Sequence, residues 1–219
     1  MADDSQGGGR MRIIIIIASG LVLLGAAIAI AIYRKKTRKK LTGKKVMLFG
    51  PSMSGKTTFL NWLIKDKPTE EHIATGSGNY EEITDGENKT IYTLCDMGGS
   101  PGFLIGGVME KKYKENDFIL MFFNCAKFIS DNAYKADVEA RFDALAVLHK
   151  QNPKPVLLIG SHWDKLDDFQ KKSIKSCGFE PFVDSSKEYS RFLRGQKLIF
   201  DNLTNKKDVI GIWKELSNL

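Results

Sequence analysis

The sequence contains few of the residues that stabilise small secreted domains or that mark disordered chains. It has three cysteines in 219 residues, Cys95, Cys125 and Cys177, and their spacing forms neither a disulfide framework nor a set of metal ligands. It has only six prolines, 42% of its residues are hydrophobic, and no internal repeat is visible, which excludes general disorder and low complexity. The expected organisation is therefore one α/β domain in a reducing compartment.

An excess of positive charge is also missing from most of the chain. The formal net charge is +7, but eight Lys and Arg residues and no acid lie between Arg34 and Lys45. From Val46 onward, 23 basic residues are balanced by 24 acidic ones. Binding to a nucleic-acid backbone needs basic residues clustered on the domain itself, so we expect no direct contact with nucleic acid.

One long hydrophobic run is present. No charged residue occurs from Ile13 to Ile32, and a helix of that length, at about 1.5 Å per residue, matches a bilayer core of about 30 Å. The pattern predicts a transmembrane helix over residues 13–33; a cleaved signal peptide, whose hydrophobic region is usually about 7–15 residues, is the alternative. The basic cluster that follows predicts a single-pass membrane protein with a cytoplasmic C-terminal domain. It could also bind anionic lipid headgroups.

These signals divide the chain into four parts. We expect a short non-cytoplasmic N-terminus over residues 1–12, the transmembrane helix over 13–33, a basic juxtamembrane linker over 34–44 and a folded domain over 45–219. In that domain short apolar segments alternate with amphipathic ones, which is typical of a mainly parallel sheet with helices on both faces. The expected strands are 45–49, 80–84, 89–96, 118–124, 156–161 and 180–184, the second and third forming an antiparallel hairpin, and the expected helices are 56–65, 103–113, 134–150 and 208–217.

A glycine-rich motif lies between the first expected strand and the first expected helix. Residues 50–57 read G-P-S-M-S-G-K-T, a match to the G-x-x-x-x-G-K-[ST] pattern of the P-loop. In that pattern backbone N–H groups surround the phosphates of a nucleotide, Lys56 reaches the β- and γ-phosphates, and the Thr57 hydroxyl binds Mg²⁺. The alternative, a chance glycine-rich turn, does not require the flanking strand and helix.

Two later segments are placed to complete a phosphate and metal site. Asp96 ends an apolar strand and opens the sequence D-M-G-G, where a carboxylate can hold Mg²⁺ through water and the N–H of Gly99 can contact a γ-phosphate. Thr75 lies between this motif and the P-loop and is a candidate switch threonine that closes over the γ-phosphate and Mg²⁺. Thr69 competes for that role, and an ordinary surface threonine is the further alternative.

Two segments near the C-terminus are candidates for contact with the base. Ser161-His162-Trp163-Asp164 follows an apolar strand, and the Asp164 carboxylate could accept hydrogen bonds from N1–H and the 2-amino group of guanine. The alternative is that Asp164 caps a helix beginning near Lys165. Ser185, Ser186 and Lys187 follow another short segment and could support the base through backbone N–H groups.

The order of these motifs resembles that of small GTPases of the Ras-like and Arf-like families. With an N-terminal membrane span, the chain is most similar to the β subunit of the signal recognition particle receptor. The resemblance implies a P-loop GTPase-type α/β fold, a mainly parallel six-stranded sheet with one antiparallel hairpin strand, preceded by one transmembrane helix. It also implies GTP or GDP and Mg²⁺ as ligands, the endoplasmic reticulum membrane as location, and partner binding through the switch loops, with the receptor α subunit as the expected partner.

Three positions differ from the usual pattern of these GTPases. Ser161 and His162 stand where Asn and Lys are usual, which predicts a weaker preference for guanine. Ser100 follows Gly99 where a glutamine usually orients the attacking water, which predicts slow hydrolysis of GTP.

The sequence therefore predicts a membrane-anchored GTP-binding switch that recruits a cytoplasmic partner in protein targeting. A scaffold that holds GTP without hydrolysing it, and a P-loop ATPase, are the alternative functions. No catalytic residue is assigned, and the switch candidates are Thr75 and Gly99. The expected metal ligands are Thr57, Thr75 and Asp96. The expected nucleotide-binding residues are Gly50, Ser52, Met53, Ser54, Gly55, Lys56, Thr57, Thr58, Gly99, Ser161, His162, Asp164, Ser185, Ser186 and Lys187.

Overall fold

The structure is a computed structural model that describes residues 43–65, 79–84, 90–97, 99, 107–178, 187–216 and 218–219. Residues Thr42–Leu219 form one compact unit. Several positions named above lie outside the described residues: Thr69, Thr75, Ser100, Ser185 and Ser186. The expected strand at 180–184 lies outside them as well.

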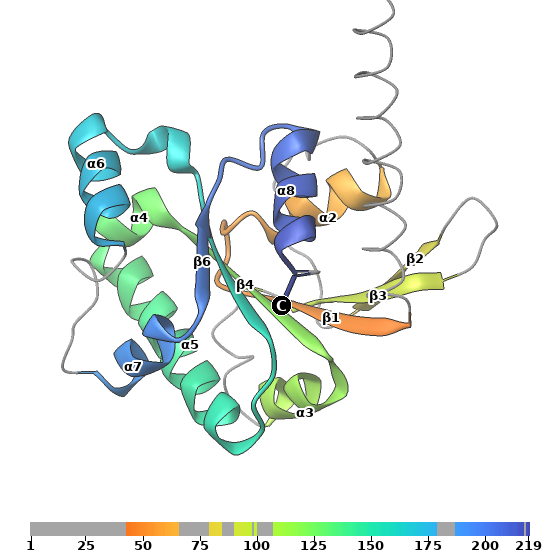
Figure 1. Cartoon of the computed structure of the whole chain (residues 1–219). Helices are drawn as coiled ribbons and strands as arrows, with labels where there is room; N and C mark the ends of the chain where they lie inside the picture. Colours follow the sequence, from red (N-terminus) through yellow and green to blue (C-terminus); the bar gives the residue numbers. More distant parts are fainter. Residues whose placement is uncertain are drawn as a thin grey trace, which may run out of the picture. The chain divides into compact units, whose positions relative to one another are not determined.

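The described chain folds as a sheet with helices on both of its faces (Figure 1). The strands are β1 (Lys44–Phe49), β2 (Asn79–Thr84), β3 (Thr90–Asp96), β4 (Phe118–Asn124), β5 (Val156–Ser161) and β6 (Lys197–Phe200). The helices are α2 (Lys56–Ile64), α3 (Val108–Glu115), α4 (Cys125–Ser130), α5 (Asn132–Gln151), the 3₁₀ turn η2 (Trp163–Lys165), α6 (Asp168–Cys177), α7 (Glu188–Arg194) and α8 (Lys206–Leu216).

The strands lie in the order β2-β3-β1-β4-β5-β6. β1, β4, β5 and β6, the strands whose side chains are described, form an all-parallel block, and β3 continues it parallel to β1. β2 pairs antiparallel with β3 at the edge. Because the parallel strands run in one direction, the loops after β1, β3, β4, β5 and β6 emerge at the same edge of the sheet, where ligands of open α/β sheets bind.

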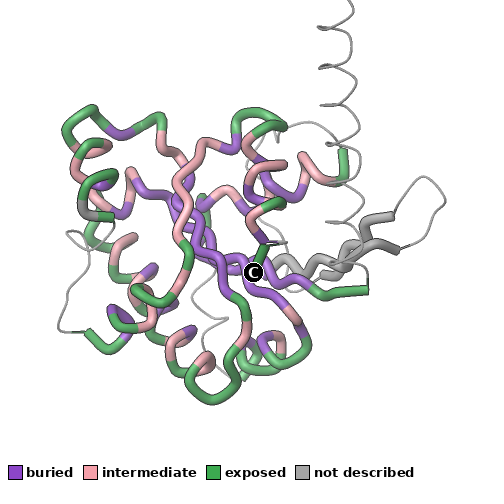
Figure 2. Tube along the Cα trace, in the orientation of Figure 1, coloured by how far each residue is buried: buried purple, intermediate pink, exposed green. Residues whose placement is uncertain are grey.

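The apolar character of the central strands follows from burial on both faces. All seven residues of β4 and all six of β5 are buried, as the tube in Figure 2 shows for the middle of the domain. Adjacent side chains on β4 point to opposite faces. Phe122 packs on Phe59 of α2, with ring centroids 5.1 Å apart, whereas Phe123 packs on Phe142 of α5 at 5.8 Å. The α2–α8 pair and the α5–α7 pair therefore cover different faces of the sheet.

The outer strand of the parallel block, β6, was not expected from the sequence. Its four residues, K-L-I-F, pair with β5 from Leu157 opposite Lys197 to Gly160 opposite Phe200. The segment is short and only partly buried, so its strand conformation depends on the neighbouring strand more than on its own pattern. The strand next to β5 is therefore contributed by residues 197–200, which a five-residue loop separates from α8.

The predicted fold class and localisation require a correction. Both included a membrane-spanning helix, and the predicted span at 13–33 lies outside the described residues. Within the part of the chain that the structure describes, no helix combines the length and the apolar composition needed to cross a bilayer. The structure thus gives no support to the expected single-pass arrangement, and the residues that it describes form an α/β sheet domain.

Candidate nucleotide-binding site

The candidate site lies at the edge of the sheet where the parallel strands end. Residues 50–55 connect β1 to α2, and the segment after β3 begins with Met97, whose N–H donates to the carbonyl of Leu48 over 2.9 Å. The loop after β6 begins with Asp201, whose N–H donates to the carbonyl of Gly160 over 3.0 Å. These bonds fix the start of each loop relative to the neighbouring strand.

The loop at 50–55 wraps around the amine of Lys56. The Lys56 Nζ donates to the carbonyls of Gly50 and Pro51, both at 2.9 Å, and to the Ser54 Oγ at 3.3 Å. Lys56 is the first residue of α2 and is buried. A buried ammonium surrounded by loop carbonyls is placed at the point where the positive end of the helix dipole meets the loop, which is a favourable position for an anion.

Two glycines in this loop are required by close contacts and unusual backbone angles. A Cβ on Gly50 would lie 2.1 Å from the carbonyl oxygen of Phe122, and Gly50 has a φ of +144°. A Cβ on Gly55 would lie 2.6 Å from a methyl carbon of Leu203, and Gly55 has a φ of +93°. Side chains are excluded at both positions, so the spacing of the motif has a steric cause in this fold.

The middle of the loop, residues 52 and 53, is solvent-accessible. Ser52 and Met53 are exposed, and Met53 adopts the left-handed conformation at a φ of 61°. Lys127, in α4, extends to this rim and donates from its Nζ to the Met53 Sδ at 3.2 Å. Nothing in the sequence indicates this role for Lys127, because a lysine three residues after a strand belongs to no motif.

The candidate metal ligands are only partly described. Thr57 and Thr58 lie in the first turn of α2 and are partly exposed. Asp96 ends β3 opposite Leu48 of β1, close to the start of the loop at residue 50; its side chain and Thr75 are outside the described part. Among the residues that the structure describes, no group of three or more His, Cys, Asp or Glu side chains is arranged to hold a metal ion.

Gly99 lies directly against the loop at 50–55, the candidate phosphate loop. A Cβ on Gly99 would be 2.3 Å from the backbone nitrogen of Ser52, so only glycine permits this approach. The Gly99 carbonyl accepts a hydrogen bond of 2.8 Å from the guanidinium of Arg141, which belongs to α5. Arg141 is far from the motifs in sequence, and only the packing of α5 under this loop reveals it.

Ser161 connects the end of β5 to the same loop. It is completely buried, and its Oγ lies 2.8 Å from the carbonyl oxygen of Ser54, 3.2 Å from that of Phe123 and 2.7 Å from the His162 Nδ1. A hydroxyl donates one hydrogen bond. If that proton goes to the Ser54 carbonyl, Nδ1 of His162 carries the ring proton and donates to Ser161, leaving Nε2 as an acceptor.

Removing the Ser161 hydroxyl should therefore destabilise the domain. We expect Ser161→Ala to lower the free energy of unfolding by about 1–3 kcal/mol, because buried polar groups lose a partner. The measurement is urea unfolding followed by circular dichroism. Ser130→Ala, which removes an exposed hydroxyl bonded to the Ala126 carbonyl, is the matched control, and an equal effect of both variants would contradict the assigned role.

Asp164 does not cap a helix in this structure. Its backbone N–H donates to the Asn202 Oδ1 at 2.7 Å, while the side chain is 40% exposed and lies 3.5 Å from the Lys165 Nζ. The helix that follows, α6, begins at Asp168 and is capped by Asp167 through a capping box with Gln170. The capping alternative for Asp164 is therefore wrong, and its carboxylate is accessible to a ligand.

The loop after β6 is the structural neighbour of Asp164. Asn202 reaches Asp164 as described, and the Leu203 carbonyl accepts a hydrogen bond of 2.9 Å from the Trp62 Nε1 of α2. Leu203 is buried with a φ of 57°. The structure thus places residues 201–203, which no sequence motif indicates, beside the candidate base site.

Lys187, one of the predicted base-contacting residues, precedes α7 and lies near Asp143 of α5. Its positive charge there opposes the rise in the pKa of Asp143 that burial causes.

The two partly buried histidines predict a pH dependence of stability. Burial lowers the pKa of His149 and of His162 below the usual 6.5; at His162, Asp164 opposes this effect while Lys165 and Lys127 add to it. The unfolded chain then binds more protons than the folded one, so stability is complete above pH 6.5 and falls as the pH drops below it. We expect His162→Gln to lose less stability than wild type between about pH 7.5 and about pH 5.5 in urea unfolding. An unchanged pH profile would contradict the shifted pKa of His162.

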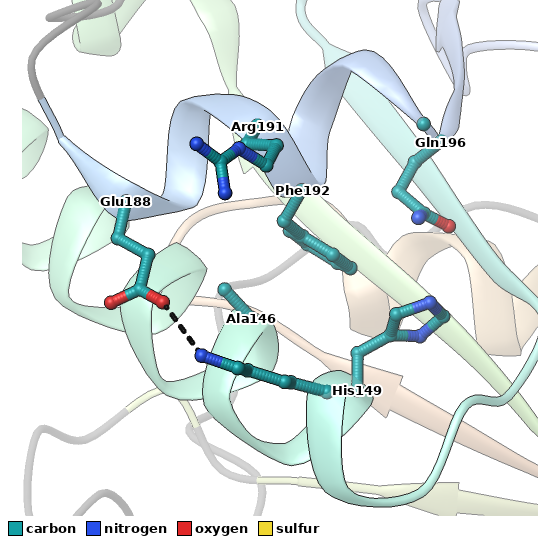
Figure 3. Close-up of a pocket in the computed structure, with 8 residues that line it drawn as sticks. Ala146, His149, Glu188, Arg191, Phe192 and Gln196 are labelled. Carbon is teal, nitrogen blue, oxygen red and sulfur yellow. Dashed lines mark hydrogen bonds and ion pairs between the residues drawn. The ribbon is translucent and has the colours of Figure 1, made fainter.

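The structure also has a cavity between α5 and α7, whose lining residues are drawn in Figure 3. Its volume is about 350 Å³, and the ion pair between Lys150 and Glu188 lies at its rim, with 3.4 Å between Nζ and Oε1. His149 and Phe192 face each other there, with ring centroids 5.3 Å apart. The cavity lies at the C-terminal end of α5 and beside the start of β6. This is the edge of the sheet opposite to the one where the parallel strands end.

A comparison of the sequence with protein-family models found no family model that matches the chain.

Proposed function

We propose that the chain binds a guanine nucleotide with Mg²⁺ and acts as a switch whose nucleotide state controls the binding of a protein partner. The observation that carries this proposal is the buried Lys56 amine held by the carbonyls of Gly50 and Pro51. A phosphate offers the amine stronger, charge-assisted partners than two neutral carbonyls. The glycines at 50 and 55 keep the loop free of side chains that would block the approach.

The chemistry of the motif residues is suited to a nucleotide and its metal ion. Lys56 would contact the β- and γ-phosphates, Thr57 would supply a hydroxyl to Mg²⁺, and Asp96 would hold the ion through water. The ion would neutralise charge on the β- and γ-phosphates. Gly99 would contact the γ-phosphate through its N–H, which makes the segment after β3 the part that distinguishes triphosphate from diphosphate.

The base would lie between the loops after β5 and β6. Asp164 would accept hydrogen bonds from N1–H and the 2-amino group of guanine, while Asn202 holds its backbone. The ring of His162, fixed through Ser161, would lie near the base at the position where Lys is usual. Adenine presents no N1–H and no 2-amino group, so it would leave the Asp164 carboxylate without partners.

Hydrolysis is expected to be slow, roughly below one turnover per minute, since Ser100 cannot orient the attacking water as glutamine does. A scaffold that keeps GTP bound would hydrolyse none in a single-turnover assay, whether or not a partner is present. The resemblance to the β subunit of the signal recognition particle receptor makes the receptor α subunit the first partner to test. Partner binding that depends on GTP but not GDP supports a switch.

Equilibrium binding tests the nucleotide assignment. Fluorescent GDP, GTP and ATP analogues are titrated into the purified full-length chain with Mg²⁺, and GTP is expected to bind at least about tenfold more tightly than ATP. Equal affinity for GTP and ATP would favour the P-loop ATPase instead. No binding of any of the three would overturn the proposal.

A further inference from the structure

Arg141 is a buried cation that the proposed chemistry leaves unassigned. Only 1% of the residue is exposed, although it lies in the middle of the surface helix α5. Its NH1 is paired with Asp137 one turn earlier, its NH2 donates to the Gly99 carbonyl at 2.8 Å, and its guanidinium lies 5.9 Å from the ring centroid of Phe49. The side chain therefore joins α5, the end of β1 and the segment after β3.

We propose that Arg141 is a positioning residue for triphosphate recognition: it holds Gly99 against the phosphate loop and so raises affinity for GTP relative to GDP. The inference rests on the proposed function. Glycine loses more conformational freedom on being ordered than any other residue. A bond that fixes Gly99 before the γ-phosphate arrives removes part of that cost from binding.

The local geometry supports a role in positioning more than one in stability. Gly99 contacts the backbone of Ser52 so closely that a Cβ would clash. A small displacement of the Gly99 carbonyl would therefore move Gly99 away from the loop at 50–55. A buried ion pair contributes little net stability compared with apolar side chains of similar volume, because both charges must be desolvated. The Nε of Arg141 also has no hydrogen-bond partner within the described residues. An arginine whose role is purely structural would normally have a hydrogen-bond partner for this buried N–H.

The effect should be confined to nucleotides that carry a γ-phosphate. GDP leaves the position next to Gly99 vacant, so its affinity does not depend on where Gly99 lies. A GTP analogue contacts Gly99, and its affinity does. The ratio of the two affinities separates positioning from a general loss of structure, which would weaken both ligands together.

The test compares Arg141→Met with wild type in the full-length chain, using GTPγS and GDP with Mg²⁺ and melting curves for each variant. We expect GTPγS to bind about tenfold more weakly while GDP changes by less than about twofold. Arg141→Lys, which keeps one donor, should recover part of the loss. Asp137→Asn removes the charge that pairs with the buried guanidinium but leaves the bond to Gly99; it should lower the melting temperature and leave the ratio of the GTPγS and GDP affinities unchanged within about twofold.

Each outcome decides the proposal. Equal loss of GTPγS and GDP, or no change in either, overturns the role of Arg141 while leaving guanine-nucleotide binding intact. If Arg141→Met fails to fold, Arg141→Lys carries the test, and unchanged GTPγS affinity in that variant overturns the inference. Failure of wild type to bind either nucleotide overturns the proposed function itself, and this inference with it.

Discussion

Replacing Lys56 with alanine is expected to weaken binding of GTP and GDP by roughly a hundredfold or more. The buried Nζ is the one cation that the loop at 50–55 encloses among the described residues. Each charge-assisted hydrogen bond to a phosphate is about twice as strong as a neutral one, and the methyl group of alanine supplies none. Titration of fluorescent GDP and GTP measures the loss.

Lys65→Ala is the matched control for this prediction. Lys65 lies at the other end of the same helix, exposed to solvent, with its backbone N–H bonded to the Asn61 carbonyl. The substitution removes the same charge from α2 at a distance from the loop, and nucleotide affinity should change by less than about twofold. Undiminished binding by Lys56→Ala, or an equal loss in both variants, would show that the loop does not bind phosphate.

Asp164→Asn is expected to change which base the protein binds. The substitution replaces an acceptor with a donor, so guanine, which donates from N1 and its 2-amino group, loses its match. Xanthine carries oxygen at position 2 and accepts from the new amide. We expect affinity for GDP to fall by roughly a hundredfold and affinity for xanthosine diphosphate to rise.

The exposed position of the Asp164 carboxylate makes this test specific. Its backbone N–H, held by Asn202, is retained in the variant, and the cap of α6 is provided by Asp167, so the fold should be preserved. Asp168→Asn, at the exposed first position of α6, is the control and should leave both affinities unchanged. Unaltered base preference in Asp164→Asn would mean that the carboxylate does not contact the base.

Much of the central fold was predictable because its signals are local. Two strands have the expected bounds, Phe118–Asn124 with the sequence F-I-L-M-F-F-N and Val156–Ser161 with the sequence V-L-L-I-G-S. They were predictable because a sheet covered on both faces requires unbroken apolar segments. The loop at 50–55 was equally predictable, because Gly50 and Gly55 both have backbone angles that disfavour other residues, and Gly50 also lies against the carbonyl oxygen of Phe122.

The parts that were missed depend on distant contacts. β6 is a four-residue segment that becomes a strand by pairing with β5, and the loop that follows it supplies Asn202 to Asp164 across 38 positions of sequence. Arg141 reads as an ordinary polar residue of a surface helix until α5 brings it to Gly99. No periodicity or spacing in the sequence predicts these long-range contacts. The switch threonine and the segment at 185–186 stay predictions.

The identity of the nucleotide that accompanies the purified protein tests the central claim most directly. The full-length chain is purified in Mg²⁺ without added nucleotide and denatured, and the released ligand is separated by anion-exchange chromatography, with Lys56→Ala purified in parallel. We expect GDP or GTP from the wild type and none from the variant. Adenine nucleotide from the wild type, or the same amount of guanine nucleotide from both proteins, would contradict it.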